Sequence, residues 1–241
     1  MRAENAIVLK NVPLPGGRVV TRIFSRERGH VSLVVPRVLD GRPTAAFTRC
    51  MQPVELEFED IPRGGLHRVT SIFPSRDVEE VYGDMIKRGV ALLWGEVLCP
   101  VLGHEGRNEA LHDYLSRSVE YLSAATGGVA NFNLFFLYRL CSLLGFRVDV
   151  SSYRPGYLFD AGDGRFHAPP PPSRFCADAA CSGLIRGLCE DSLESASRLR
   201  LDRVSRVALL DAALLFIGLH LDVSFDTKAL RVVRSIFSDG E

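Results

Sequence analysis

The stretch RVVTRIFSRERGHVSLVVP, residues 18–36, decides how the first part of this 241-residue chain folds. Residues 18–24 alternate, with Val19, Thr21 and Ile23 on one face, and residues 30–36 alternate in the same way. Period-two alternation over short runs is typical of half-buried strands. The segment between the two runs ends in Gly29, which suits a hairpin turn. The stretch therefore predicts two antiparallel strands.

Three more runs around this hairpin predict strands at residues 5–10, 54–59 and 68–73. The cleanest alternation sets Val54, Leu56 and Phe58 against three glutamates, Glu55, Glu57 and Glu59. Prolines and glycines at residues 13–17 break the chain after the first strand. Five antiparallel strands with a longer excursion after the third predict a small barrel of the OB type.

From residue 78 the apolar spacing becomes helical, with breaks at Gly127-Gly128 and Gly145. Asn108 and Asp226 are placed as N-caps. Residues 159–166 predict a small hairpin, and prolines follow at 169–172. The predicted helices lie at about 81–100, 108–126, 132–144, 177–196, 199–220 and 227–237. We expect an α+β multi-domain protein, with an OB-type barrel over 1–77 and a helical domain over 78–241 that carries an irregular hairpin and Pro-rich segment at about 152–175.

Composition places the chain among ordinary globular proteins, with 46% hydrophobic and 24% charged residues. It argues against disorder, a collagen-like chain and a disulfide miniprotein. We expect no membrane-spanning segment, because the most apolar run, 207–221, is interrupted by Asp211 and is shorter than about 20 residues. The N-terminus lacks the apolar core of a signal peptide. We therefore expect a cytoplasmic protein.

The six cysteines predict no metal centre. None forms a C-x-x-C pair, and the spacing of Cys176, Cys181 and Cys189 matches no common zinc template. A zinc site there is the less favoured alternative. The favoured one is that Cys99, Cys141, Cys181 and Cys189 are small apolar residues on helices, kept reduced in the cytosol.

No catalytic constellation is present in the sequence, which holds no G-x-S-x-G, P-loop or G-x-G-x-x-G motif and no H-x-x-x-H pair. The glutamates at 55, 57 and 59 favour a solvated strand face over a cation site. Tyr157 and Phe159 favour anchoring of the hairpin over substrate binding. We expect no enzyme activity and no cofactor.

The net charge of zero conceals a basic N-terminal segment. Residues 1–52 hold nine basic and three acidic groups, whereas residues 53–80 hold three and seven. OB barrels bind single strands through a charged groove and aromatic stacking, and arginine suits phosphate. A solvated Arg-rich surface, a core position for Phe24 and a merely polar helix side near residue 203 remain alternatives. The candidate DNA-binding residues are Lys10, Arg18, Arg22, Phe24, Arg26, Arg28, Arg37, Arg42, Arg203 and Arg206.

Taken in order, seven short motifs along the chain resemble those of the RecO recombination mediators, particularly of the Bacteroidetes type. Their order over nearly the whole chain makes the resemblance specific. The motifs are Ala6-Ile7-Val8-Leu9-Lys10, the hairpin Ile23–Gly29, Met51-Gln52-Pro53 before its strand, Ala91–Leu98, Leu143-Leu144-Gly145-Phe146, Tyr157–Asp160 with Gly164-Arg165-Phe166, and Leu219-His220-Leu221 with Lys228-Ala229-Leu230.

The resemblance implies an OB domain and a helical domain that bind single- and double-stranded DNA and anneal complementary strands. It implies partnership with RecR and with the C-terminal tail of single-strand binding protein, and through them the loading of RecA, with association with the nucleoid during repair. Two departures matter. Residues 35–42 replace a strongly basic K-G-x-R-K segment, so DNA affinity is expected to depend on RecR, and the C-x-x-C zinc pair of some relatives is missing.

Binding of the acidic tail requires apolar walls and a cation in the helical domain. Arg139, on the apolar helix, is the candidate for the charge; a helix arginine whose head merely reaches solvent is its alternative. Two other functions stay open. One is a protein–protein adaptor with little DNA binding, which the row of glutamates favours. The other is an enzyme that uses the 157–166 hairpin or a cysteine.

Overall fold

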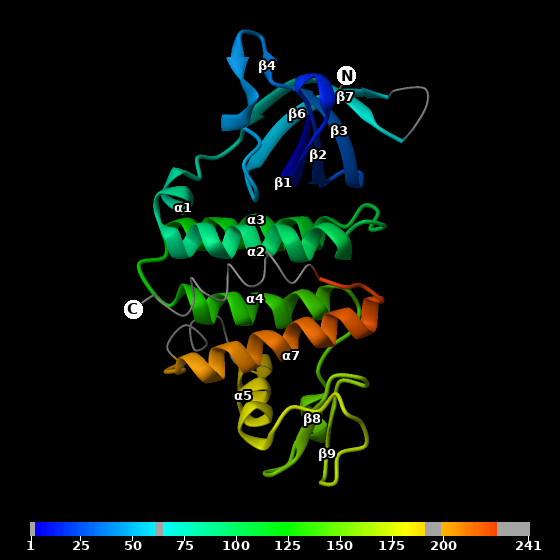
Figure 1. Ribbon diagram of the computed structural model, residues 1–241, viewed down its shortest axis with the longest axis vertical. Helices are drawn as coiled ribbons and strands as arrows, with labels where there is room; N and C mark the ends of the chain where they lie inside the picture. The colour runs from blue at the N-terminus through cyan, green and yellow to red at the C-terminus, as the bar shows by residue number, and fades with distance from the viewer. Residues whose placement is uncertain (1–2, 61–64, 191–198, 226–241) are drawn as a thin grey trace. The chain divides into compact units, whose positions relative to one another are not determined.

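The computed structural model describes residues 3–60, 65–190 and 199–225 (Figure 1). The chain divides into two compact units, Met1–Ala124 and Ala125–Glu241. The predicted helix at 227–237, its cap Asp226 and the end of the helix predicted to reach 196 lie outside the described residues.

The first unit contains a closed five-stranded barrel in which the strand order is β1-β2-β3-β7-β6. Its strands are β1 (Glu4–Pro13), β2 (Arg18–Ser25), β3 (Gly29–Pro36), β6 (Pro53–Asp60) and β7 (His67–Pro74). Four neighbouring pairs are antiparallel, but β3 and β7 are parallel. The expectation of five antiparallel strands is wrong for this pair, because β7 runs opposite to β6 and so reaches β3 in the same direction.

The alternation in the sequence is the alternation between the barrel interior and its surface. Val31, Leu33 and Val35 of β3 point into the core together with Leu56 and Phe58 of β6. The glutamates of β6 point outward, where Glu55 and Glu59 are exposed and Glu57 is half-buried. The excursion after β3 forms a second small hairpin, β4 (Val38–Leu39) with β5 (Arg42–Pro43). Short 3-10 turns lie at Pro15–Gly17, Thr44–Ala46 and Val150–Ser152.

Three helices complete the first unit, and two of them cover part of the barrel's outer surface. They are α1 (Glu79–Gly83), α2 (Met85–Val101) and α3 (Glu109–Ala124), and both α2 and α3 contact β1. The close approach is at Gly95, where a Cβ atom would lie 2.5 Å from the carbonyl oxygen of Leu9. Ile7, Leu9 and Phe24, which are not part of the barrel's inner core, are therefore also buried.

The second unit packs three described helices against one another and against a hairpin. They are α4 (Val129–Leu143), α5 (Ala179–Glu190) and α7 (Arg203–Leu221), and the hairpin strands are β8 (Leu158–Asp160) and β9 (Arg165–His167). Phe159 is buried and its ring lies 5.5 Å from that of Phe216, so it anchors the hairpin as the sequence indicated. The predicted fold class, an OB-type barrel followed by helices with a small hairpin, is confirmed.

The chain divides into compact units at a different residue from the predicted domain boundary. The barrel ends at Pro74, near the predicted residue 77, but the compact units meet between Ala124 and Ala125. The reason is that α2 and α3 pack on β1. A domain division at residue 77 stays a prediction.

One described helix, α7, is long and apolar enough to cross a membrane by length and composition alone. This corrects the expectation that no segment reaches that range, because the helix has 19 residues and extends beyond the apolar run 207–221 on which the expectation was based. Core helices of soluble proteins pass the same test. Six of its side chains, from Leu209 to Ile217, are buried, and α7 contacts α4 and α5, as expected of a core helix.

We predict that Gly95→Ala destabilises the first unit by about 1–3 kcal/mol, the range for an overpacked core. The new methyl group would lie 2.3 Å from the Cys50 sulfur as well as against Leu9. Urea unfolding monitored by the single tryptophan, Trp94, measures the loss, since Trp94 is buried in the same helix. The control is Gly83→Ala, where a Cβ meets nothing within 4 Å. Equal midpoints for the two variants would contradict this role of Gly95.

Candidate nucleic-acid interface

Part of the barrel surface is left uncovered, and cross-strand pairing sets which side chains share it. Lys10 of β1 lies opposite Arg22 of β2, which lies opposite Ser32 of β3. Directly opposite residues project to the same side of a sheet. The register therefore places Lys10 and Arg22 on one outward surface, with Arg18 on the same side four residues along β2, opposite Pro36. We call this surface the β1–β2–β3 face.

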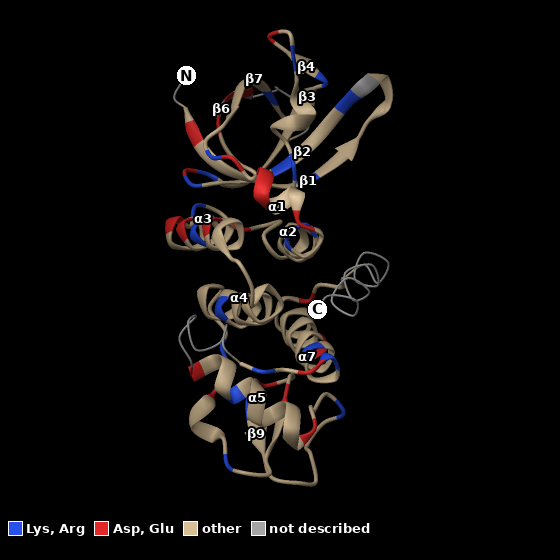
Figure 2. Ribbon diagram, turned by 90° about the vertical axis from the view of Figure 1, so that its left-hand side faces the viewer, with Lys and Arg blue, Asp and Glu red and all other residues tan. Residues whose placement is uncertain are grey.

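Arg18 marks the open end of this face, and the β4–β5 hairpin continues from it. Pro36 lies opposite Arg18 and is followed by Arg37, and Arg42 stands on β5. All three arginines are exposed, and no acidic partner is described for any of them. In Figure 2 basic positions, in blue, occur on β2 and in the β4 arm. These three guanidinium groups are available to an anion in solution.

The other end of the face lies against α2, where Lys10 and Arg22 have different partners. Lys10 Nζ donates to Glu96 at 2.8 Å, so its charge is balanced by a carboxylate. Arg22 Nη1 donates to the Cys99 sulfur at 3.2 Å. That partner is a sulfur atom, and no carboxylate is described against Arg22.

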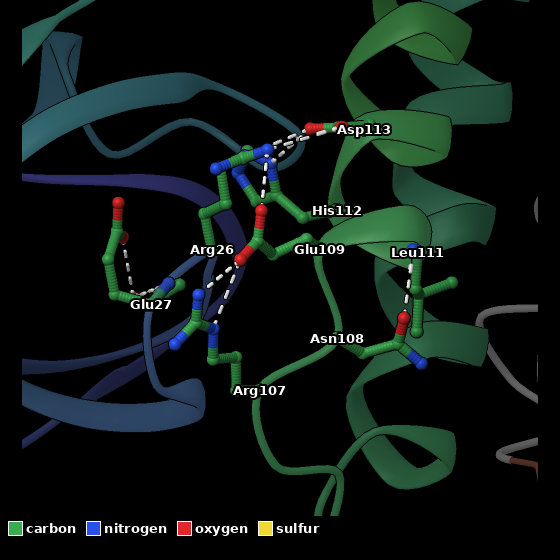
Figure 3. A network of polar contacts seen from close by, with 9 residues as sticks. Arg26, Glu27, Arg107, Asn108, Glu109, Leu111, His112 and Asp113 are labelled. Atoms are coloured by element: carbon green, nitrogen blue, oxygen red, sulfur yellow. Dashed lines mark hydrogen bonds and ion pairs between the residues drawn. The ribbon is translucent and has the colours of Figure 1, made fainter.

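Two other predicted DNA contacts, Arg26 and Arg28, are paired with carboxylates of the first unit. Arg26 Nη2 lies 2.8 Å from Glu109 and its Nε lies 3.1 Å from Asp113, both on α3 (Figure 3). The Arg26 guanidinium holds the pKa of Asp113 below its usual range. Arg28 pairs with Glu4 at 2.7 Å and lies over the ring of Phe58. A polyanion would have to compete with these carboxylates, so the described role of both arginines is structural, and DNA contact by them stays a prediction.

Phe24 is a buried core residue, which was the alternative to its role as a DNA contact. Its side chain has 0% exposure and lies opposite Ile7 on β1. A ring without exposed surface cannot stack on a base, which corrects its place among the candidate contacts. The alternation of β2 puts Phe24 on the side opposite to the barrel-core residue Ile23, and the sequence alone did not show that this side is covered.

The second basic cluster, Arg203 and Arg206, lies in the first turn of α7 in the other unit. Arg203 is exposed and Arg206 is half-buried. Asp202 caps the helix by accepting from the Ser205 amide at 2.8 Å, and this hydrogen bond lowers the pKa of Asp202. The positive end of the helix dipole adds to the two guanidinium charges. Their contact with DNA stays a prediction.

Arg139 lines a cavity of about 330 Å³ in the second unit. It is exposed on α4, and a second arginine, Arg147, lies on the same rim. The apolar wall includes Phe135, Val148 and Leu188, and Asp149 adds one carboxylate. The sequence did not identify Arg147, because it follows the helix end at Gly145 and carries no spacing that relates it to Arg139.

The described residues contain one group whose ligand atoms could hold a cation together, Asp160, Asp163 and His167 on the β8–β9 hairpin. His167 Nε2 and Asp163 Oδ2 already share a 2.8 Å hydrogen bond. The group includes no cysteine. Cys99, Cys141 and Cys181 are buried on helices and Cys189 is half-buried on α5, as the favoured interpretation had them.

A buried histidine lies next to the arginine network and predicts a pH effect on stability. His112 of α3 is 6% exposed; its ring nitrogens make no hydrogen bond within normal distance, and Nδ1 lies 3.7 Å from Asp113 Oδ1. Burial lowers the pKa of His112 below the ordinary value of about 6.5. The unfolded chain then binds the proton more tightly, so stability is complete above pH 6.5 and decreases as the pH falls toward the folded-state pKa.

We predict that His112→Leu flattens this dependence, because it removes the buried imidazole. Urea midpoints at pH 7.5 and 5.5 should lie closer together in the variant than in the natural protein. His104→Gln serves as the control, since His104 is exposed. An unchanged difference between the two midpoints in His112→Leu would show that His112 does not titrate on unfolding.

No family model matches this chain, but whole-length relatives do. It is 29% identical over 233 residues to a DNA repair protein RecO of Porphyromonas gingivalis, covering 90% of this chain and 91% of that protein. It is 22% identical to one from Azobacteroides pseudotrichonymphae, over 96% and 97% of the two chains, and 23% identical to one from Flavobacterium psychrophilum, over 97% and 98%. The resemblance to RecO proteins that the motifs indicated is confirmed.

Proposed function

We propose that this chain, which resembles RecO proteins along nearly its whole length, is a DNA repair protein that binds single- and double-stranded DNA and anneals complementary strands. The similarity to proteins named DNA repair protein RecO supports the repair role. The observation that carries DNA binding is the β1–β2–β3 face, where Arg18 and Arg22 share one surface beside Arg37. The proposal contains no chemical step and no cofactor.

Annealing follows from charge neutralisation on this face. Arginine forks match phosphate oxygens and pair with them in a bidentate way. A strand whose phosphates are neutralised repels its complement less. Since only part of the basic surface is free of carboxylate partners, affinity by the chain alone is expected to be modest and to rise with RecR. In the cytoplasm, where we place the protein, the pair would help load RecA at repair sites on the nucleoid.

We predict that Arg18→Ala with Arg22→Ala weakens single-strand binding and lowers its salt dependence. Each phosphate contact contributes about 0.7 to the slope of log affinity against log salt on single strands, so the double variant should lose about 1.4. Fluorescence anisotropy of a labelled oligonucleotide at several salt concentrations, with and without RecR, measures both effects.

A matched control removes the same charge from elsewhere in the unit. Arg88 of α2 and Arg117 of α3 are both exposed, so Arg88→Ala with Arg117→Ala lowers the net charge equally without touching the face. Equal weakening by the two double variants would refute a local site, and absence of binding under every condition would refute the DNA mechanism.

For the Arg139 cavity we propose that it receives the C-terminal tail of single-strand binding protein. Two arginines on the rim suit the carboxylates of an acidic peptide, and the apolar wall suits its aromatic end. Burial of an aromatic side chain and charge-assisted hydrogen bonds are the usual anchors of such interfaces.

We predict that Arg139→Ala and Arg147→Ala each weaken binding of a short acidic peptide with a C-terminal aromatic residue by about tenfold, the cost of about 1.4 kcal/mol. Isothermal titration calorimetry measures it. Arg174→Ala, another exposed arginine of this unit, should leave the affinity unchanged. Full affinity in Arg139→Ala would place the tail elsewhere.

The adaptor function remains the second candidate, and one observation favours it. Lys10, Arg26, Arg28 and Arg49 are paired with carboxylates, which lowers the charge that the barrel offers to DNA. An adaptor would bind its protein partners while showing no salt-dependent affinity for oligonucleotides.

A further inference from the structure

We propose that the β1–β2–β3 face holds the sugar–phosphate backbone of a single DNA strand and leaves its bases directed away from the protein, free to pair. This inference deepens the proposed function and rests on it. It concerns which part of the strand the face contacts, and it is carried by the side chains that lie between the arginines.

A row of valines separates the two ends of the face. Val12 of β1 lies opposite Val20 of β2, which lies opposite Val34 of β3. Val20 sits between Arg18 and Arg22, so the row crosses the middle of the basic surface. Val12 is 37% exposed and the other two are half-buried. Short branched side chains make a low apolar surface without a π-face on which a base could stack.

The phenylalanine rings of the barrel lie elsewhere, and the imidazole of His30 on β3 is half-buried opposite the buried Phe24. Residues 1–77 contain four phenylalanines and neither tyrosine nor tryptophan. Phe24 and Phe58 are buried, and Phe47 lies in the excursion before β6. Phe73 is 49% exposed but lies opposite Glu55, beside the row of glutamates, which repels phosphate. Proteins that stack bases on an OB barrel present aromatic rings on the binding face; this face presents valines.

Arg18 and Arg22 lie on opposite sides of the valine row, where each can contact a phosphate. Arg18 and Arg22 are four residues apart on one strand, which separates their backbone positions by about 13 Å. The hydrogen bond to the Cys99 sulfur holds Arg22 toward α2, at the margin of the face. A strand that crosses the face would therefore meet positive charge, then an apolar surface suited to sugars, then positive charge again.

The consequence concerns annealing. A strand held by its backbone keeps its hydrogen-bonding edges exposed, so a complement can pair without the first strand being released. Neutralised phosphates at the same time lower the repulsion between the strands. Base stacking on the protein would instead have to be broken before each pair could form.

The test compares two oligonucleotides of 20 nucleotides, oligo-dT and the same length built from abasic tetrahydrofuran sites, by anisotropy at low salt. We expect affinities that differ by less than tenfold. A stacked base contributes about 1–3 kcal/mol, so loss of even two such contacts would exceed tenfold and overturn the inference while leaving DNA binding intact. Absence of binding to both oligonucleotides would overturn the inference together with the proposed function.

Two further readouts locate the effect. Arg18→Ala with Arg22→Ala should weaken the abasic and the dT oligonucleotide by the same factor if both occupy this face; a loss for dT alone would overturn the inference. Permanganate oxidation, which attacks exposed thymine rings, should proceed on bound dT at the rate seen on free dT. Protection of the thymines by fivefold or more would show that the bases face the protein.

Discussion

The packing of α2 on β1 at Gly95 determines which part of the β1 surface is covered and which part stays accessible to a ligand. The helix backbone approaches Leu9 so closely that no side chain fits between them. This contact buries residues that a barrel alone would expose, Ile7 and Leu9 among them. It also brings Glu96 and Cys99 close to β1 and β2, where Glu96 accepts a hydrogen bond from Lys10 and Cys99 accepts one from Arg22. The β1–β2–β3 face is part of the barrel surface that stays uncovered, together with the outward side of β6 and β7.

Charge is separated on the barrel surface as a result. The open arginines lie on and beside β2 and β3, whereas β6 carries Glu55, Glu57 and Glu59 outward. Arg26 and Arg28 do not belong to the open arginines, because they form ion pairs with carboxylates of α3 and β1. A polyanion approaching such a surface is oriented by the field before contact, and this affects the encounter rate more than the final affinity. The zero net charge of the chain is compatible with a basic face of this kind.

Local patterns sufficed to predict the strands, the hairpins and the N-cap. Asn108 accepts from the Leu111 amide at 3.1 Å, and the outward glutamates of β6 follow from period-two alternation. The burial of Phe24 and the parallel pairing of β7 with β3 could not be predicted, because both depend on contacts between segments far apart in the chain. The valine row has the same origin, since Val12, Val20 and Val34 are aligned by register rather than by sequence spacing. Arg26 was counted as a free cation because its partners lie more than eighty residues away.

The central claim, that DNA occupies the β1–β2–β3 face, is tested most directly by arginine footprinting. Phenylglyoxal modifies accessible guanidinium groups, and mass spectrometry locates each modified site with and without a single-stranded oligonucleotide. The account predicts protection of Arg18, Arg22 and Arg37, with Arg88 and Arg117 modified at the same rate in both samples. Unchanged modification of Arg18 and Arg22 in the presence of bound DNA would contradict it.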